Sequence, residues 1–230
     1  MIVDETLSQI SAVLYTTLAT QRHSFDIARD TVDRGIEGDI VECGVAAAGN
    51  FASMIVGALS VEGGDKRKFW GFDSFQGIQL AGPKDRLQPG LGAITHDVNA
   101  PEESLLVSSG VTVHSREGVE RLLRRWGLSK LASIELVEGW VQHTLPKVSY
   151  RIQRIAVLRL DMDLYAPTQC ALEWLGRKVV SGGTIIIDDW DLDGPRSAFI
   201  EWCDWSGRDW QSMQIPHYDG EENQGYFVQP

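Results

Sequence analysis

Cysteines, basic residues and long apolar runs are scarce in this sequence. Its 230 residues contain only three cysteines, Cys43, Cys170 and Cys203, and no C-x-x-C pair. So few widely spaced cysteines indicate neither a disulfide framework nor a zinc site, and they favour the reducing cytoplasm. The N-terminus lacks a basic start followed by an apolar stretch, and no run approaches the roughly 18 apolar residues of a membrane-spanning helix. We therefore expect neither a signal peptide nor a membrane partner.

The shortage of basic residues sets the charge of the chain. Lys and Arg total 21 against 32 Asp and Glu, which gives a formal net charge of -11. Nucleic-acid backbones and anionic membranes repel such a protein, so we expect neither as a partner. The length and the 43% content of apolar residues suit one sizeable core. We predict a single domain over residues 1–230, with an N-terminal helical cap over 1–36 and an α/β core over 37–230.

The spacing of apolar residues predicts alternating strands and helices. Strands are expected over residues 38–45, 68–75, 132–140, 154–164 and 182–190. Helices are expected over residues 5–20, 24–35, 49–60, 115–127, 167–179 and 195–205. Strands that alternate with helices indicate an α/β fold, in which helices cover both faces of a mostly parallel sheet.

Two further segments carry turn residues. Residues 212–218 and 224–230 suit a C-terminal hairpin that adds an antiparallel strand to the sheet. The stretch 77–99 is rich in Gly and Pro and is long for a connection in a compact domain. We expect it to be a lid or another functional loop.

The first two predicted strands end in residues typical of a cofactor site. Gly44 and Gly49 enclose the turn after the first strand, where backbone can approach a cofactor near a helix N-terminus. The alternative is that these glycines only permit a tight turn. Asp73 ends the second strand, where a carboxylate can accept hydrogen bonds from both hydroxyls of a ribose. The alternative is an aspartate that caps the following loop.

The same turn distinguishes between two cofactors. A dinucleotide fingerprint needs a glycine where the backbone touches the pyrophosphate, and this chain has Ala46, Ala47 and Ala48. S-adenosylmethionine has no phosphate, so the pattern favours it over NAD. Glu42 is a candidate for binding the ammonium of its methionine portion, or it pairs with a nearby Arg.

Four aspartates follow two other predicted strands. Asp161 and Asp163 follow one strand, and Asp188 and Asp189 follow another. Parallel strands end at one edge of a sheet, and carboxylates that converge there without basic residues nearby repel one another unless a cation joins them. Oxygen ligands select Mg²⁺, with Mn²⁺ or Ca²⁺ as alternatives. Asp161, Asp188 and Asp189 are therefore candidate metal ligands.

Asp163 is a candidate general base beside this metal. It lies on the same face as Asp161 if the strand continues past residue 161. The alternative is that these aspartates cap the helices and loops that follow, for example the helix predicted from residue 167.

Five segments resemble one known family in order and spacing. They are "GDIVECGV", "FWGFDSFQGI", "GWVQHTLP", "LRLDMDLYAPT" and "GGTIIIDDW", and they resemble the macrocin O-methyltransferase family over residues 36–200. Members of that family methylate sugar hydroxyls of macrolide and aminocoumarin antibiotics. The resemblance implies a class I methyltransferase Rossmann-like fold, with S-adenosylmethionine and a divalent metal.

The resemblance also implies roles for individual residues. It assigns Asp161, Asp188 and Asp189 to the metal, with Asp161 also a candidate cofactor contact, and Asp163 to proton abstraction. Asp73 and Ser74 match the ribose contacts, and Gly139 and Trp140 match the segment near the adenine. His143 stands where an acidic residue is common, so it is either a surface histidine or a second proton acceptor.

The sequence thus predicts a magnesium-dependent O-methyltransferase of natural-product or antibiotic biosynthesis. Its expected acceptor is a sugar with a vicinal diol in a glycosylated small molecule, because adjacent hydroxyls chelate a metal. A catechol or phenol acceptor is the alternative. An NAD-dependent dehydrogenase and a non-catalytic metal-binding protein are the alternatives from other classes. We expect a homodimer, and a basic run that includes Arg121 and Arg124 is either a solvated helix face or a dimer contact.

Overall fold

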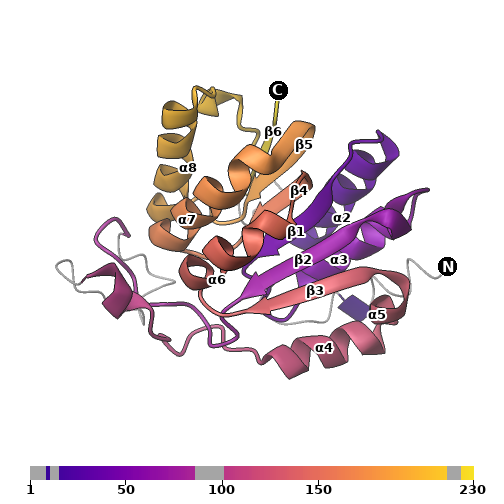
Figure 1. The fold of residues 1–230 in the computed structure, drawn as a ribbon, viewed down its shortest axis with the longest axis horizontal. Coiled ribbons are helices and arrows are strands. Elements are labelled where there is room, and N and C mark those ends of the chain that lie inside the picture. The colour runs from indigo at the N-terminus through magenta and orange to yellow at the C-terminus, as the bar shows by residue number, and fades with distance from the viewer. Residues whose placement is uncertain (1–8, 11–15, 86–100, 217–223) are drawn as a thin grey trace.

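The computed structural model describes residues 9–10, 16–85, 101–216 and 224–230. In this part of the chain six strands form one sheet in the order β3-β2-β1-β4-β5-β6 (Figure 1). Their bounds are β1 Asp39–Cys43, β2 Lys68–Asp73, β3 Ser133–Glu138, β4 Ile155–Leu160, β5 Val179–Ile187 and β6 Gly225–Val228. Neighbours among β1 to β5 are parallel, and β6 is antiparallel to β5. The predicted α/β fold with a mostly parallel sheet is confirmed.

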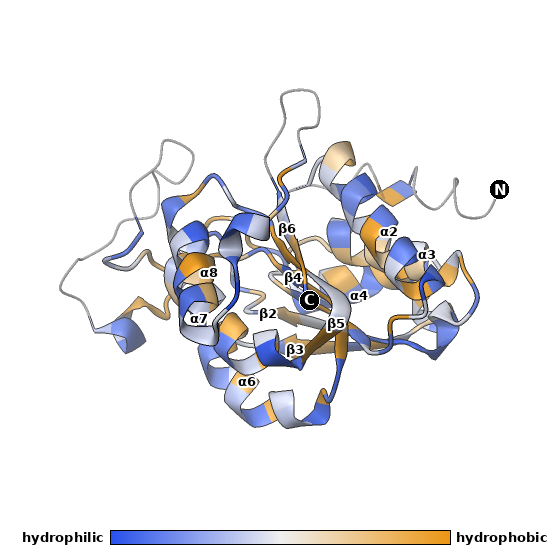
Figure 2. Cartoon of the chain, turned by 90° about the horizontal axis from the view of Figure 1, so that it is seen from above, coloured by the Kyte–Doolittle hydropathy of each residue, from blue (hydrophilic) through white to orange (hydrophobic). Residues whose placement is uncertain are grey.

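Helices cover both faces of this sheet (Figure 2). One face carries α2 Leu18–Asp33, α3 Gly49–Leu59, α4 Arg116–Arg125 and the short α5 Leu128–Leu131. The other carries α6 Val141–Val148, α7 Tyr165–Leu175 and α8 Asp193–Ser206. Short 3-10 turns lie at Gly64–Lys66, Glu102–Leu105, Ser149–Arg151, Gly176–Lys178 and Trp210–Ser212.

Side-chain alternation along the strands produces two apolar cores. In β1, Val41 and Cys43 pack into the core beneath α6, α7 and α8, whereas Ile40 packs into the core beneath α2 and α3. Successive side chains of a strand point to opposite faces, so a sheet covered on both faces needs nearly continuous apolar strands. The buried β1 and β4 have this composition.

The N-terminal helices differ from the prediction. We expected a break before Ser24, but α2 runs without interruption from Leu18, and Thr17 and Thr20 form a capping box at its start. Ser24 is buried inside the helix, and its hydroxyl donates to Asn50 Oδ1 at 3.3 Å. The predicted helix 5–20 lies largely outside the described residues, which begin at 9–10 and resume at 16.

Two other predicted segments differ from the structure, and a third lies largely outside the described residues. β4 ends at Leu160, so Asp161 and Asp163 lie beyond the strand. The predicted C-terminal hairpin is half present, because β6 pairs with β5 while residue Gln214 forms only an isolated bridge with Tyr226. Most of the stretch 77–99 lies outside the described ranges, and within them Gln79 bridges to Ser108. No helix in the described ranges is both long and apolar enough to span a membrane.

Candidate active site

A cavity of about 390 Å³ opens where the five parallel strands end. Residues that follow each of these strands line it: Gly44 and Ala46 after β1, Asp73 and Ser74 at and after β2, Trp140 after β3, Asp161, Met162 and Asp163 after β4, and Asp188 and Asp189 after β5. Eight of the twelve predicted site residues are in this lining. The other four, Glu42, Gly49, Gly139 and His143, are not.

Gly44 allows the ends of β1 and β4 to approach each other. Its φ is +89°, and a Cβ at this position would lie 1.6 Å from the backbone carbonyl oxygen of Asp161. The Asp161 N–H donates to the Cys43 carbonyl at 2.9 Å across the same contact. Gly44 is therefore needed to place the backbone of Asp161, which supports the tight-turn interpretation of this glycine.

Asp73 connects the turn after β1 to the loop after β2. Its Oδ2 accepts hydrogen bonds from the backbone N–H groups of Val45 and Ala46, each at 2.8 Å, and its Oδ1 accepts one from Phe75 at 2.6 Å. Burial raises the pKa of Asp73, and these backbone hydrogen bonds oppose that shift. The carboxylate caps the loops, as one interpretation expected, and it also lines the cavity.

Glu42 pairs with an arginine. Its Oε1 lies 2.7 Å from Nη1 of Arg159, and both side chains are buried. Burial raises the pKa of Glu42 to about 8 despite the attraction of the Arg159 guanidinium. Of the two interpretations of Glu42, the structure shows the pair with a nearby Arg.

Three of the aspartates converge. Carboxylate oxygens of Asp161, Asp188 and Asp189 all lie within 4.8 Å of one another. Burial and the neighbouring carboxylates raise the pKa of Asp161 and of Asp189 well above the ordinary range. A donor set made only of oxygens suits a hard divalent cation, which would relieve this repulsion. The residues present therefore fit the predicted metal.

The expectation that no basic residue lies near the aspartates is wrong. The fully buried Arg159 donates to Asp161 Oδ2 at 2.6 Å and to Asp188 Oδ1 at 2.5 Å. One guanidinium carries a single positive charge among several carboxylates, so a cation would still reduce the repulsion between them. An arginine inside the apolar strand "IAVLRL" was the signal in the sequence that could have revealed this contact.

Asp163 reaches the cavity through a turn. We expected a continuing strand to put it on the face of Asp161, which is wrong because β4 ends at Leu160. Asp163 instead adopts a left-handed conformation with a φ of 61°, and its backbone N–H donates to Asp189 Oδ2 at 3.0 Å. Aspartate tolerates this conformation better than most residues.

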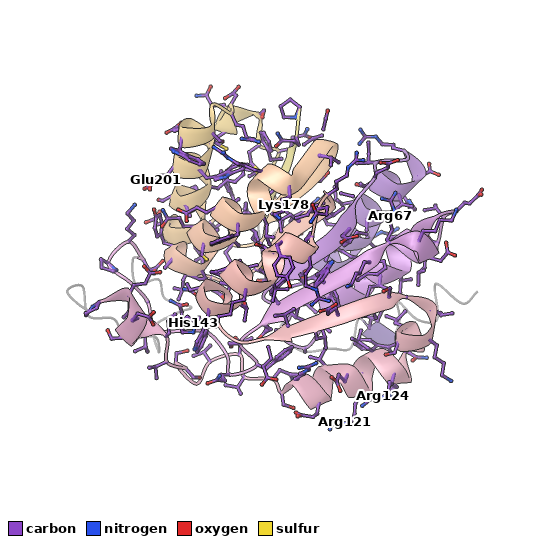
Figure 3. All side chains as sticks on the ribbon, viewed as in Figure 1. Arg67, Arg121, Arg124, His143, Lys178 and Glu201 are labelled. Carbon is purple, nitrogen blue, oxygen red and sulfur yellow. The ribbon has the colours of Figure 1, made fainter. Side chains whose placement is uncertain are left out.

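His143 lies apart from the cavity lining. Its side chain is half-exposed on α6 (Figure 3), and its Nε2 lies 3.3 Å from Glu103 Oε2. This environment supports the interpretation of a surface histidine. Arg121 and Arg124 likewise lie on the outer side of α4 (Figure 3), and Arg124 pairs with Glu120 at 3.7 Å, which suits a solvated helix face.

Two glutamines in the lining were missed. Gln142 Nε2 donates to Gln79 Oε1 at 2.8 Å. The Oε1 atom of Gln142 is buried and has no hydrogen-bond partner among the residues that the structure describes. The pair was not foreseen because α6 was not predicted, and its residues are 63 positions apart.

Comparison with known proteins identifies the family. The model of the family described as Macrocin-O-methyltransferase (TylF) matches residues 12–208. The chain belongs to this family. The predicted resemblance is thereby confirmed, and it extends further towards the N-terminus than the motifs indicated.

Two curated relatives of this family member come from Streptomyces. The 8-demethyl-8-(2,3-dimethoxy-alpha-L-rhamnosyl)-tetracenomycin-C 4'-O-methyltransferase of Streptomyces olivaceus is 36% identical, over 81% of this chain and 64% of its own length. The demethyldecarbamoylnovobiocin O-methyltransferase of Streptomyces niveus is 32% identical, over 72% and 58%. The chain thus spans less than two thirds of the length of either relative.

A solved structure shares the fold. The O-methyltransferase NovP superposes with a TM-score of 0.71 at 26% identity, over 93% of this chain and 80% of that one. The fold is the Rossmann-like fold of class I methyltransferases, as predicted.

Proposed function

We propose that this chain is an S-adenosylmethionine-dependent O-methyltransferase that uses Mg²⁺ to methylate a sugar hydroxyl of a glycosylated natural product. The observation that carries the proposal is the convergence of Asp161, Asp188 and Asp189, with Asp163 beside them, on a cavity that the ends of five parallel strands enclose. The two relatives, whose names specify O-methylation of glycosylated or antibiotic-type molecules, support it.

The cofactor would occupy the side of the cavity formed after β1, β2 and β3. The volume of the cavity, about 390 Å³, lies within the usual range for small-molecule sites. The Asp73 carboxylate has about four lone-pair sites, and three backbone N–H groups already donate to it. About one site remains for a ribose hydroxyl. Ser74 and Trp140 complete this side, and the buried Gln142 oxygen offers an acceptor for an amino group.

The metal would be held by the three converging aspartates. When bound, Mg²⁺ would act as a Lewis acid, which makes a hydroxyl group easier to deprotonate than it is in neutral water. The chain prepares this position by fixing two of the ligands, because Arg159 donates to both Asp161 and Asp188. Burial and the neighbouring carboxylates raise the pKa of Asp161 and of Asp189, and a bound cation would reduce the repulsion between these groups.

Asp163 would remove the proton of the acceptor hydroxyl. The new O–CH₃ bond forms as the S–CH₃ bond breaks, the proton goes to the Asp163 carboxylate, and S-adenosylhomocysteine leaves. A sulfonium methyl is already electrophilic, so alignment of the acceptor oxygen and removal of its proton are the tasks left to the protein. General bases of this kind contribute roughly 10²-fold to 10⁴-fold to rate.

Titration calorimetry with S-adenosylhomocysteine tests the cofactor assignment. We expect one-to-one binding, and no binding of NAD under the same conditions. As a control, Gln76→Ala should bind S-adenosylhomocysteine like the wild type, because it alters an exposed side chain that lies just after Ser74 and outside the cavity lining. Failure to bind S-adenosylhomocysteine, or binding of NAD in its place, would reject the proposal.

A further inference from the structure

Gln224 connects one of the aspartates to the N-terminal helix. It immediately precedes β6 and is 1% exposed. Its Nε2 donates to Oδ1 of Asp188, and its Oε1 lies 2.7 Å from Nδ1 of His23. His23 is buried in α2, and it is 201 positions away from Gln224. Three segments far apart in the sequence thus meet in one hydrogen-bonded chain.

The direction of each hydrogen bond follows from the chemistry of the groups. An ionised carboxylate only accepts, so Gln224 must turn its NH₂ group towards Asp188 and its carbonyl oxygen towards His23. His23 must therefore carry a proton on Nδ1. Burial lowers the pKa of His23, which favours the neutral imidazole, and the neutral tautomer with its proton on Nδ1 satisfies this bond.

These contacts leave one oxygen of Asp188 available. Its Oδ1 accepts from Arg159 Nη2 at 2.5 Å as well as from Gln224 Nε2. An oxygen of a carboxylate has two lone-pair sites, and both are used here. The Oδ2 atom is then the one left for a cation.

We propose that Gln224 and His23 are positioning residues that hold the Asp188 carboxylate in the orientation required to bind the divalent cation. The proposal rests on the metal role in the proposed function. It assigns a task to a residue beyond the region of the family match, which ends at residue 208. Partners of this kind around metal ligands typically change metal affinity by about 10-fold to 100-fold when they are lost.

The order of residues in this hydrogen-bonded chain predicts how substitutions of His23 and Gln224 combine. His23 hydrogen-bonds Gln224, and Gln224 hydrogen-bonds Asp188, so His23 acts on the position of this carboxylate through the Gln224 amide. Removal of His23 should therefore matter only while Gln224 is present. The two substitutions should be strongly non-additive, since they interrupt one chain of hydrogen bonds.

The experiment is Mn²⁺ titration followed by electron paramagnetic resonance, on full-length protein saturated with S-adenosylhomocysteine. Gln224→Met keeps the length of the side chain and removes both polar groups, and it should weaken Mn²⁺ binding by about 10-fold to 100-fold. His23→Phe keeps an aromatic ring beside Tyr226, whose ring centroid is 5.3 Å away, and should cause a smaller loss. The double variant should bind Mn²⁺ no more weakly than Gln224→Met alone.

Ser24→Ala is the matched control. Ser24 is the next residue of α2, is fully buried and hydrogen-bonds Asn50 instead of the aspartates. This variant should keep the wild-type Mn²⁺ affinity. His23→Gln, which retains an N–H donor, should keep more affinity than His23→Phe, and this comparison decides the matter if Gln224→Met does not fold.

The outcomes separate this proposal from the proposed function. Wild-type affinity in Gln224→Met, or an additive loss in the double variant, would overturn the positioning role while leaving the metal site in place. Absence of Mn²⁺ binding to the wild-type protein would instead reject the metal role itself, and the positioning role with it.

Discussion

Two of the buried aspartates lower the stability of the fold at neutral pH. A carboxyl group whose pKa is raised on folding binds its proton more tightly in the folded state, so it lowers stability at a pH above its ordinary pKa. Asp161 and Asp189 are both in this position. A group of residues that opposes folding in this way is typical of a functional site.

Asp189→Asn tests this cost. In the presence of chelator at neutral pH, we expect the variant to unfold with a free energy about 0.5–2 kcal/mol higher than the wild type. The reason is that the cost of burying the charge and the repulsion from Asp163 and Asp188 are removed, while the amide oxygen can still accept the hydrogen bond from the Asp163 N–H. Urea denaturation measures the difference, and a lower stability would show that the carboxylate is stabilising.

Asp163→Asn separates proton abstraction from binding. We expect kcat to fall by roughly 10²-fold to 10⁴-fold, because the acceptor proton loses its destination. Affinity for S-adenosylhomocysteine and for Mn²⁺ should change little. Asp191→Asn alters an exposed aspartate in the loop after β5 and serves as control. An undiminished kcat would remove Asp163 from the mechanism.

The contact between the ends of β1 and β4 depends on Gly44. Gly44→Ala should destabilise the protein by about 1–2 kcal/mol through its positive φ, and by about 1–3 kcal/mol more through displacement of the Asp161 backbone. Gly35→Ala is the control, because Gly35 also has a positive φ but nothing lies within 4 Å of its missing Cβ. Equal losses of unfolding free energy in the two variants would show that the contact is unimportant.

The start of α7 is capped from outside the helix. Its N-cap residue Leu164 makes no side-chain cap, and Asp85 instead accepts from the Tyr165 N–H at 2.7 Å. Gly194 makes room for it, since a Cβ there would lie 2.3 Å from Asp85 Oδ1. Lys84, next to Asp85, pairs with Glu201 of α8 at 2.8 Å.

Asp85→Ala should therefore affect both stability and turnover. Loss of a cap costs about 1–2 kcal/mol, and the start of α7 lies only two residues after Asp163. Ser115→Ala removes the cap of α4, which lies outside the cavity lining, and should cost similar stability while leaving turnover unchanged. Thermal unfolding and initial rates distinguish the two, and a normal kcat in Asp85→Ala would contradict the link to Asp163.

Local patterns predicted most of the elements but not their meeting points. The five parallel strands were predicted because apolar runs that end in Gly or Asp can be recognised from the local sequence alone. The helix α6 was missed because Pro146 lies inside it, and proline normally ends a helix. The contact of Arg159 with Glu42 joins residues 117 positions apart, and that of Gln224 with His23 joins residues 201 apart, which periodicity cannot reveal.

Across the whole molecule, the site draws on both ends of the described chain. Thr16 and Thr17, just before α2, line the cavity, and Gln224 at the start of β6 contacts Asp188. The N-terminal segment and the antiparallel edge strand are thus parts of the site as well as coverings of the sheet. The expected homodimer stays a prediction, and size-exclusion chromatography with light scattering would test it.

The central claim is that the aspartate cluster and the cavity form a metal-dependent site for sugar methylation. The most direct measurement is mass spectrometry of glycosides with vicinal diols, incubated with the protein and S-adenosylmethionine that carries a labelled methyl group. We predict transfer of a labelled methyl group to a sugar oxygen in the presence of Mg²⁺, and its loss with chelator or in Asp188→Asn. Transfer that persists undiminished with chelator and in Asp188→Asn, or transfer to catechols but to no sugar, would contradict the account.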